Sequence, residues 1–215
     1  MSDDLTLYYH PLSSYCWKVL IALYENDIPF TPRIVQDEES AAELSDYWPL
    51  GKFPILVAGD AVIAETSVMI EWLDLNYPGA FVAIPDDPEK ALAVRMMDRL
   101  FDSYIMTPMQ KFVADRIRPE GANRDPYGVE EAGKLLATAY GLIEAEMAGC
   151  PWAAGGDFSM ADCAAFPALY YANKVQPFGE SHPALASYLD RLTARASIVR
   201  VLEQAKPYLH MFPEA

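Results

Sequence analysis

Two adjacent serines and a cysteine lie where a predicted strand gives way to a predicted helix, in the segment Ser13-Ser14-Tyr15-Cys16. A serine hydroxyl at such a position can accept a hydrogen bond from an unpaired amide of the first helical turn, as an ordinary N-cap does. The unpaired amides of a helix terminus can also bind a small anion, which would give the segment a chemical role. The spacing alone favours the cap and leaves the chemical role open.

Cys16 lies three residues after Ser13, where the second cysteine of a Cys-x-x-Cys redox motif would stand. Because a serine occupies the first position, the segment holds no dithiol. We expect Cys16 to be a small, buried residue of the first helical turn. The alternative is a thiol of low pKa that forms a mixed disulfide.

Two further segments of the first half combine polar side chains with unusual backbone positions. Pro54 follows Phe53 at the start of an apolar run, where a proline removes a donor from the strand ladder. Lys52 precedes them and can meet a carboxylate or remain solvated. Thr66 is predicted to cap the next helix, and Glu65 lies beside it. A helix start with a hydroxyl, an amide and a carboxylate suits a zwitterionic amino-acid group.

The elements that must position these residues form an alternating pattern. Strands are predicted over 5–10, 29–36, 55–57 and 61–64, the last two forming a hairpin, and helices from the serines to about Asn26, over 38–48 and over 66–77. This alternation predicts a small α/β unit with a mixed sheet. The serines would then start the first helix, while Pro54 and Thr66 would flank the hairpin.

The second half of the chain has a different pattern. A stretch rich in proline and aspartate over 76–90 predicts a linker, and almost no strand-like run follows it. Helices are predicted over 88–118, 129–149 and 160–175, and residues 183–205 are predicted to supply one or two more. Pro108 should kink or split the first of them, and Ser159 and Asp162 have the spacing of a capping box. The sequence therefore predicts an α/β domain over 1–80 and an all-helical domain over 86–215.

Composition excludes several classes of function. The chain has 215 residues, of which 52% are hydrophobic, so it can bury a substantial core. Its formal net charge of −15 disfavours nucleic acid, whose phosphates are held mainly by lysine and arginine. No apolar run is long enough for a membrane span, and the acidic start does not resemble a signal peptide. Three cysteines without zinc-type spacing suit a reducing cytoplasm and predict no metal.

Four segments resemble the glutathione transferase family. They are SSYCWKVLIAL (13–23), GKFPIL (51–56), AETSVMIEWL (64–73) and PWAAGGDFSMADC (151–163). The first is similar to the serine-type active-site segment of the zeta and related classes, and the chain resembles a zeta-like bacterial member. The second resembles a Gly-Lys-Val-Pro segment with a cis proline. The resemblance implies a thioredoxin-like α/β N-terminal domain followed by an all-α C-terminal domain.

The resemblance also implies a role for each polar segment in binding reduced glutathione, which is a co-substrate. Ser13 takes the catalytic place and stabilises the thiolate, while Ser14 is its neighbour; a shift of one residue in register would exchange them. Phe53, before a cis Pro54, pairs its backbone with the peptide, and Lys52 meets a carboxylate. Glu65 holds the ammonium of the γ-glutamyl group and Thr66 its carboxylate.

A second substrate would occupy the helical domain. In the family, the helix at 96–118 lines the electrophile pocket, which makes Tyr104, Thr107 and Lys111 candidates, together with Tyr9 at the end of the first strand. Methionines near these residues would suit a broad apolar substrate. The Arg-Gly-Arg that accompanies tyrosine-type sites is absent, so Tyr9 is the lesser catalytic candidate.

The expected function is conjugation of glutathione to a small, hydrophobic electrophile by a cytoplasmic homodimer that needs no metal, as in detoxification. An alternative is a glutathione-dependent cis-trans isomerase like the maleylacetoacetate isomerases, although Tyr15 replaces the cysteine of their usual motif. Another alternative is a non-catalytic module that binds a protein partner.

Overall fold

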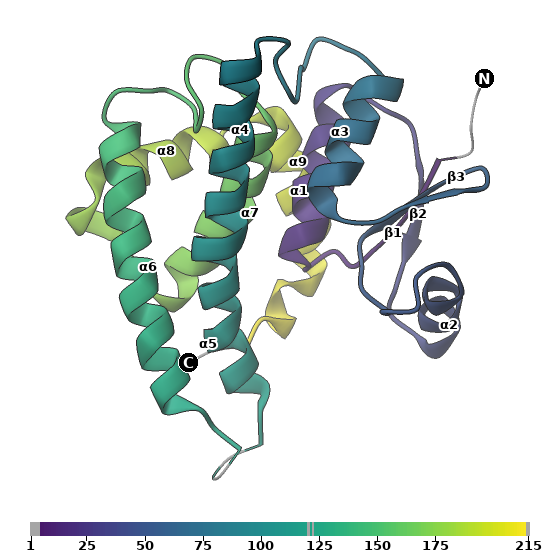
Figure 1. The fold of residues 1–215 in the computed structure, drawn as a ribbon. Coiled ribbons are helices and arrows are strands. Elements are labelled where there is room, and N and C mark those ends of the chain that lie inside the picture. The colour runs from purple at the N-terminus through teal and green to yellow at the C-terminus, as the bar shows by residue number, and fades with distance from the viewer. Residues whose placement is uncertain (1–4, 120, 122, 214–215) are drawn as a thin grey trace.

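The computed structural model describes residues 5–119, 121 and 123–213, and its first half is a four-stranded sheet with helices (Figure 1). The strands are β1 (Leu5–Tyr9), β2 (Thr31–Ile34), β3 (Ile55–Ala58) and β4 (Ala61–Ile63), in the order β2-β1-β3-β4. β1 pairs parallel with β2 and antiparallel with β3, and β3 and β4 form a hairpin. The predicted mixed sheet is therefore confirmed; β1, β2 and β4 are shorter than predicted, and β3 is one residue longer.

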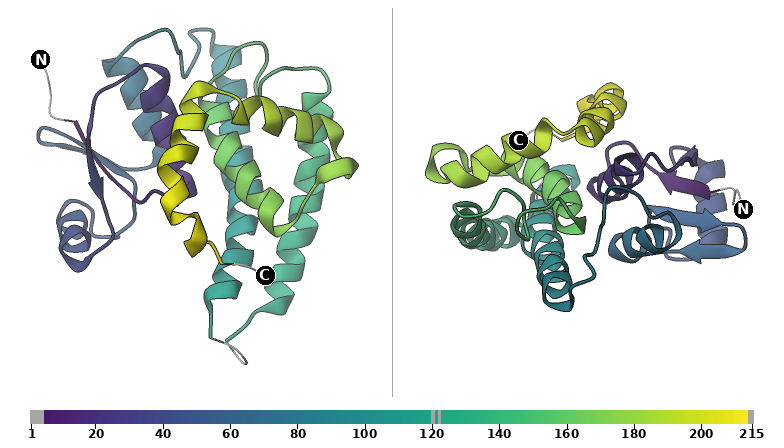
Figure 2. Two further views of the ribbon diagram at one scale, coloured as in Figure 1. Left: turned by 180° about the vertical axis from the view of Figure 1, so that it is seen from behind. Right: turned by 90° about the horizontal axis from the view of Figure 1, so that it is seen from above.

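Three helices accompany the sheet: α1 (Ser14–Glu25), α2 (Glu38–Tyr47) and α3 (Thr66–Asn76). α1 and α3 lie between the sheet and the helices of the second half, whereas α2 lies away from them (Figures 1 and 2). α1 is buried along most of its length because its side chains are almost all apolar. Lys18 is the charged residue within this buried stretch, and its side chain has 0% exposure.

The start of α3 differs from the prediction. Glu65, and not Thr66, is the N-cap, and Thr66 is already the first helical residue. The chain turns from β4 into α3 through a left-handed backbone at Glu65, with φ +68°, and no side chain caps the helix. A non-glycine residue in this region is uncommon, and such residues concentrate at functional sites. The prediction that Thr66 is the cap was wrong because the sequence carries no signal for this turn.

The second half consists of helices packed beside α1 (Figure 2). They are α4 (Pro88–Leu100), α5 (Thr107–Ile117), α6 (Pro126–Met147), α7 (Met160–Val175), α8 (Pro183–Thr193) and α9 (Ala196–Ala205), with short 3₁₀ helices at Gly179–Ser181 and Lys206–Met211. α7 is the buried centre, and its Asp162 forms the predicted capping box with Ser159. Asp162 also accepts hydrogen bonds from the Ala153 amide and the Tyr188 hydroxyl, at 2.9 and 2.6 Å. Among the described residues, no helix is both long and apolar enough to cross a membrane.

The long helix predicted over 88–118 is divided by a π-helical segment just before Pro108. α4 continues directly into a π-helical segment, η1 (Phe101–Met106), and then into α5, where Pro108 is in the first turn. Proline has no amide hydrogen and its ring would clash with the carbonyl of residue 104, four positions earlier. The wider π turn precedes it, with the Thr107 amide bonded to the Asp102 carbonyl. π segments are frequent at functional sites, and this one faces the first half of the chain.

Candidate functional site

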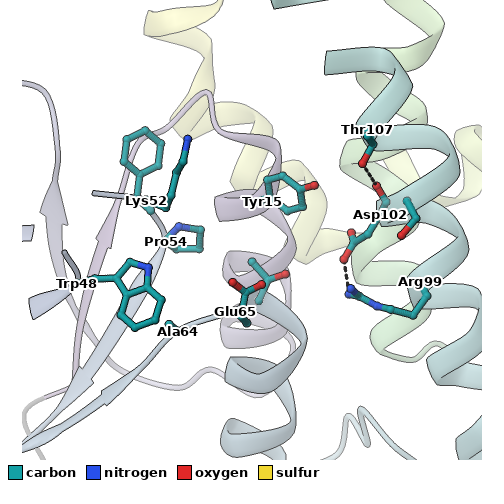
Figure 3. A pocket seen from close by; sticks show the side chains of 12 residues that line it. Tyr15, Trp48, Lys52, Pro54, Ala64, Glu65, Arg99, Asp102 and Thr107 are labelled. Atoms are coloured by element: carbon teal, nitrogen blue, oxygen red, sulfur yellow. Dashed lines mark hydrogen bonds and ion pairs between the residues drawn. The ribbon is translucent and has the colours of Figure 1, made fainter. Parts of the chain in front are cut away.

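A cavity of about 280 Å³ opens between the sheet-containing half and the continuous helix of α4, η1 and α5 (Figure 3). The first half lines it with Tyr15, Trp48, Lys52, Phe53, Pro54, Ala64, Glu65 and Thr66, and the second half with Arg99, Asp102, Ser103 and Thr107. The cavity therefore exists only because the two halves dock against each other.

The five residues that the sequence singled out for binding glutathione meet in this cavity: Lys52, Phe53, Pro54, Glu65 and Thr66. The peptide bond between Phe53 and Pro54 is cis. The pairing of β3 with β1 begins at Ile55, so Phe53 lies beyond the end of the paired ladder. Its backbone is therefore positioned at the rim of the cavity, next to the side chains of Glu65 and Thr66, which come from the turn into α3.

The two serines lie at the start of α1, close to this cavity but not among its lining residues. Ser13 is the N-cap, and its Oγ accepts a hydrogen bond from the Cys16 amide at 3.3 Å. Ser14 is the first helical residue and is buried. The prediction that one of the two serines is an ordinary N-cap is thus confirmed for Ser13. The bond uses the oxygen of Ser13 as an acceptor, so the hydroxyl proton remains able to point elsewhere.

Tyr15 is the residue of this segment that lines the cavity, with its side chain directed toward η1 (Figure 3). Burial, aided by the negative charge of Asp102, raises the pKa of its phenol above the ordinary value. Tyr15 is therefore a neutral hydroxyl at physiological pH. The sequence prediction treated it only as a replaced cysteine and missed its place in the site.

Cys16 is fully buried in the core. Burial raises the pKa of its thiol to about 12, although a hydrogen bond with Ser13 and another with the His10 backbone act in the opposite direction. A thiol with such a pKa stays protonated and unreactive near neutral pH. This agrees with the expected core role.

Three of the four electrophile-pocket candidates lie outside this cavity. Tyr9 is buried and lines a different cavity of about 290 Å³ with Tyr24, and burial raises the pKa of Tyr9 to about 12. Tyr104 is 52% exposed, and Lys111 forms an ion pair with Asp125. Only Thr107 lines the cavity, where its hydroxyl donates to the Asp102 carbonyl at 3.0 Å.

Arg99 and Asp102 form the opposite, charged wall, and they belong to a buried ionic cluster that the sequence prediction missed. Lys18 of α1 lies 2.6 Å from Asp98 and 2.8 Å from Asp102, and Arg99 pairs with both carboxylates. Ser67 of α3 accepts from Lys18 and donates to Asp98, at 3.0 and 2.7 Å. The cluster therefore ties α1 and α3 to α4 and η1.

Charge balance explains how this cluster tolerates burial. Its two cations and two carboxylates compensate each other: Lys18, Asp98 and Asp102 are buried, and Arg99, which is 55% exposed, joins them from the surface. Burial is still the dominant influence on Asp102 and raises its pKa, while the nearby Lys18 lowers it. One carboxylate oxygen of Asp102, Oδ1, is buried without a hydrogen-bond partner among the described residues.

Comparisons with known proteins are consistent along the whole chain. Residues 7–81 match the family model of the glutathione S-transferase N-terminal domain, and residues 126–191 match that of the C-terminal domain. Glutathione S-transferase A of Pleuronectes platessa is 29% identical over 92% of this chain and 91% of its own length. FtsZ-localized protein A of Caulobacter vibrioides is 29% identical over 84% of this chain and 81% of its own.

A solved structure supports the same fold. The glutathione S-transferase of Methylobacillus flagellatus KT, which has glutathione bound, superposes with a TM-score of 0.84 and 26% identity. The match covers 92% of this chain and 98% of that one. The expected fold class, a thioredoxin-like α/β domain followed by a helical domain, is thereby confirmed. The two matched domains, the coverage of the relatives and the shared fold show that the chain belongs to the glutathione S-transferase family of enzymes.

Proposed function

We propose that the protein binds reduced glutathione in the cavity between its two halves and transfers it to a small electrophile. The observation that carries the proposal is the convergence of Phe53, Glu65 and Thr66 on one cavity beside the start of α1. Family membership supports the reaction class. We divide the chain into a glutathione-binding domain over 1–80 and a helical domain over 86–215, with the cavity at their boundary.

In this proposal the charged groups at both ends of glutathione each have a polar or charged partner. Glu65 binds the ammonium of the γ-glutamyl group, and Thr66 offers a hydroxyl and a first-turn amide to its carboxylate. The Phe53 backbone, which lies beyond the paired part of β3, forms hydrogen bonds with the peptide. Lys52, on the exposed side of the cavity, meets the glycyl carboxylate.

The thiol is proposed to lie at the N-terminus of α1, where Ser13 acts as the catalytic residue. A helix N-terminus carries a partial positive charge that favours a thiolate. The Ser13 oxygen accepts from the Cys16 amide, which leaves its proton available to donate to the sulfur. A fall of one to two units in the thiol pKa requires roughly 1.4 to 2.7 kcal/mol, which one charge-assisted hydrogen bond and the helix terminus can supply together.

The second substrate is proposed to enter beside Thr107 and Tyr15. Holding the thiolate and an electrophile together, at a lowered thiol pKa, accounts for the rate without a metal. The four residues from the helical half are polar or charged, so the wall itself does not favour a purely hydrophobic substrate. We therefore propose a small electrophile, and conjugation assays with apolar and polar electrophiles distinguish its polarity.

We further propose a homodimer in the cytoplasm. Apolar side chains are exposed on α3 and α4, namely Val68, Leu75, Leu92 and Met96. An ion pair between Glu71 and Arg95, at 2.6 Å, joins the two helices on this surface. Such a surface matches the apolar core and polar groups of a subunit interface. Sedimentation at micromolar concentration should give a dimer, and a monomer would contradict the assignment. The three cysteines are unpaired, as a reducing compartment permits.

The proposal predicts that glutathione binds in the millimolar range or tighter and that binding depends on Thr66. Titration calorimetry of the wild type, followed by conjugation assays with apolar and polar electrophiles, tests it. Thr66→Val, which keeps the size of the side chain but removes its hydroxyl, should weaken binding about ten- to a hundredfold, since a hydrogen bond to a charged group contributes about 1.5–3 kcal/mol. Thr138→Val, at an exposed helical threonine, is the matched control.

The alternatives give different results in the same experiment. Absence of binding by the wild type would favour a non-catalytic module that binds a protein. Binding without conjugation of any electrophile would favour the glutathione-dependent isomerase, and isomerisation of a cis-unsaturated acid would then be the activity to measure. If the wild type binds glutathione and Thr66→Val binds it with the same affinity, the γ-glutamyl group lies elsewhere.

A further inference from the structure

We propose that His10 is a positioning residue that holds the Ser13 hydroxyl in place relative to Phe53, in the segment before β3 that is proposed to bind glutathione; the proposal rests on the proposed function. His10 is half-buried between the end of β1 and the start of α1. It touches no residue of the helical wall of the cavity in the contacts that the structure describes. Its influence is on the turn that carries Ser13.

Both hydrogen-bonding ends of this turn come from His10. Its carbonyl accepts from the Ser13 amide at 2.9 Å, and its Nδ1 accepts from the Leu12 amide at 3.2 Å. Pro11, the residue between His10 and Leu12, has no amide hydrogen. One residue therefore satisfies every amide donor of the turn from its main chain and its side chain.

The remaining carbonyls of the turn accept hydrogen bonds from side chains of α1 and α7. Pro11 accepts from the Trp17 indole at 2.6 Å, and Leu12 accepts from the Tyr171 hydroxyl at 2.8 Å. Since buried backbone groups without partners are costly, this complete set favours a single conformation of the turn. Removing the His10 ring leaves the Leu12 amide as the one group without a protein partner.

The protonation state of His10 follows from this geometry. Because Nδ1 accepts a hydrogen bond, the ring proton must reside on Nε2. Burial lowers the pKa of His10 below its ordinary value, so the neutral ring is favoured further. His10 is therefore a constant acceptor near neutral pH and is not itself the acid or base of the reaction.

The ring of His10 also connects three separate segments. It stacks on Phe53 at a centroid distance of 6.1 Å and an interplanar angle of 27°. It meets Tyr208 of the C-terminal 3₁₀ helix Lys206–Met211 edge-on at 5.7 Å and 70°. Both distances are in the range of favourable aromatic pairs. Phe53 lines the cavity and is proposed to bind the peptide. Through its contact with Phe53, His10 therefore couples the position of Ser13 to that of the peptide-binding backbone.

Positioning of this kind should affect the acidity of the bound thiol more than the affinity for glutathione. A displacement of the order of 1 Å at a reacting group can lower the rate about a hundredfold. The glutathione-binding side chains Lys52, Glu65 and Thr66 make no contact with His10 among the contacts that the structure describes. Loss of the Nδ1 acceptor should therefore change kcat and the pH profile while KM for glutathione stays nearly constant.

Two variants separate the two functions of the ring. His10→Phe keeps the aromatic contacts with Phe53 and Tyr208 but removes the acceptor for the Leu12 amide. His10→Asn loses the ring but keeps an acceptor, because an asparagine side chain readily bonds an amide two residues ahead. His182→Phe, the same substitution at the start of α8, is the control for a general effect on stability.

The measurements are kcat and KM for conjugation across pH, the ultraviolet absorbance of the bound thiolate, and the thermal midpoint. We expect His10→Phe to lower kcat about ten- to a hundredfold and to move the pH profile upward, and His10→Asn to recover most of the thiolate. An unchanged pH profile in an active His10→Phe variant overturns the role of His10 alone. Activity losses that only follow the thermal midpoints in both variants overturn it as well. Absence of glutathione binding in the wild type overturns the proposed function together with this one.

Discussion

Replacement of Ser13 by alanine should lower glutathione conjugation by about ten- to a hundredfold while leaving glutathione affinity nearly unchanged. The hydroxyl is proposed to donate to the thiolate, and a hydrogen bond to a charged group contributes about 1.5–3 kcal/mol. Without it the pKa of the bound thiol should rise by one unit or more, so the alkaline shift of the pH–rate profile is the primary measurement.

The same substitution also removes the N-cap of α1, because Ser13 Oγ accepts from the Cys16 amide. Loss of a cap typically costs about 1 kcal/mol of stability. Ser13→Gly separates the two effects, because glycine at an N-cap costs roughly a few tenths of a kcal/mol but carries no side-chain donor. We expect Ser13→Gly to stay close to the wild-type thermal midpoint and to lose activity, and Ser13→Thr to retain both. The denaturation midpoint of each variant is the control.

Ser14 provides the decisive comparison. It is buried as the first residue of α1 and forms no cap bond. If Ser14→Ala abolishes conjugation and Ser13→Ala does not, the assignment of the catalytic serine is off by one residue. If neither variant changes the pH profile, the thiolate is stabilised without a serine hydroxyl, and Tyr15, which lines the cavity, becomes the next candidate.

Local signals explain how much of this site the sequence could predict. The strand-to-helix transitions place Ser13 at the cap of α1 and Phe53-Pro54 at the start of β3, because proline, serine and β-favouring runs act within a few residues. The motif resemblance then groups them with Glu65 and Thr66. The cavity does collect Phe53, Pro54, Glu65 and Thr66.

Three predicted electrophile-pocket residues lie outside the cavity because tertiary packing decides which side chains line it. Tyr9 was grouped with the helix at 96–118, but it lines the cavity that also holds Tyr24. Tyr104 and Lys111 belong to that helix, but the π segment at Phe101–Met106 changes which side chains face the site. No local pattern marks a π turn, apart from the proline that follows it.

The buried ionic cluster had a signal that was available in the sequence. Lys18 is the only charged residue in the apolar run from Tyr15 to Tyr24. A lysine is almost never fully buried without a partner, so its position on an apolar helix implies a carboxylate elsewhere. Asp98 and Asp102 have the i, i+4 spacing of one helix face. Which carboxylates are partners of Lys18 cannot be derived from spacing, because the contact joins residues more than eighty positions apart.

Replacement of Lys18 by methionine should destabilise the protein by about 3–5 kcal/mol, because breaking a buried ion pair leaves an uncompensated charge. Lys18 has 0% exposure, and only Arg99 would remain to balance Asp98 and Asp102. Urea denaturation measures the change. Lys134→Met, which breaks exposed pairs with Glu130 and Glu131 away from the proposed subunit interface, is the matched control and should cost no more than about 1 kcal/mol.

The pH dependence of this loss identifies its cause. Burial raises the pKa of Asp102 in the native state and Lys18 lowers it, so Lys18→Met should raise that pKa further. A carboxyl whose native pKa lies above its unfolded value binds more protons when folded, and its stability contribution falls as pH rises. The deficit of Lys18→Met should therefore shrink as the pH is lowered from 8 to 5. A deficit that is constant with pH would point to lost packing of the lysine stem. A deficit equal to that of Lys134→Met would show that the cluster contributes no more than a surface pair. Asp102 also lines the cavity. A deficit that shrinks at low pH would therefore show that Lys18 balances the charge of a residue in the proposed glutathione site.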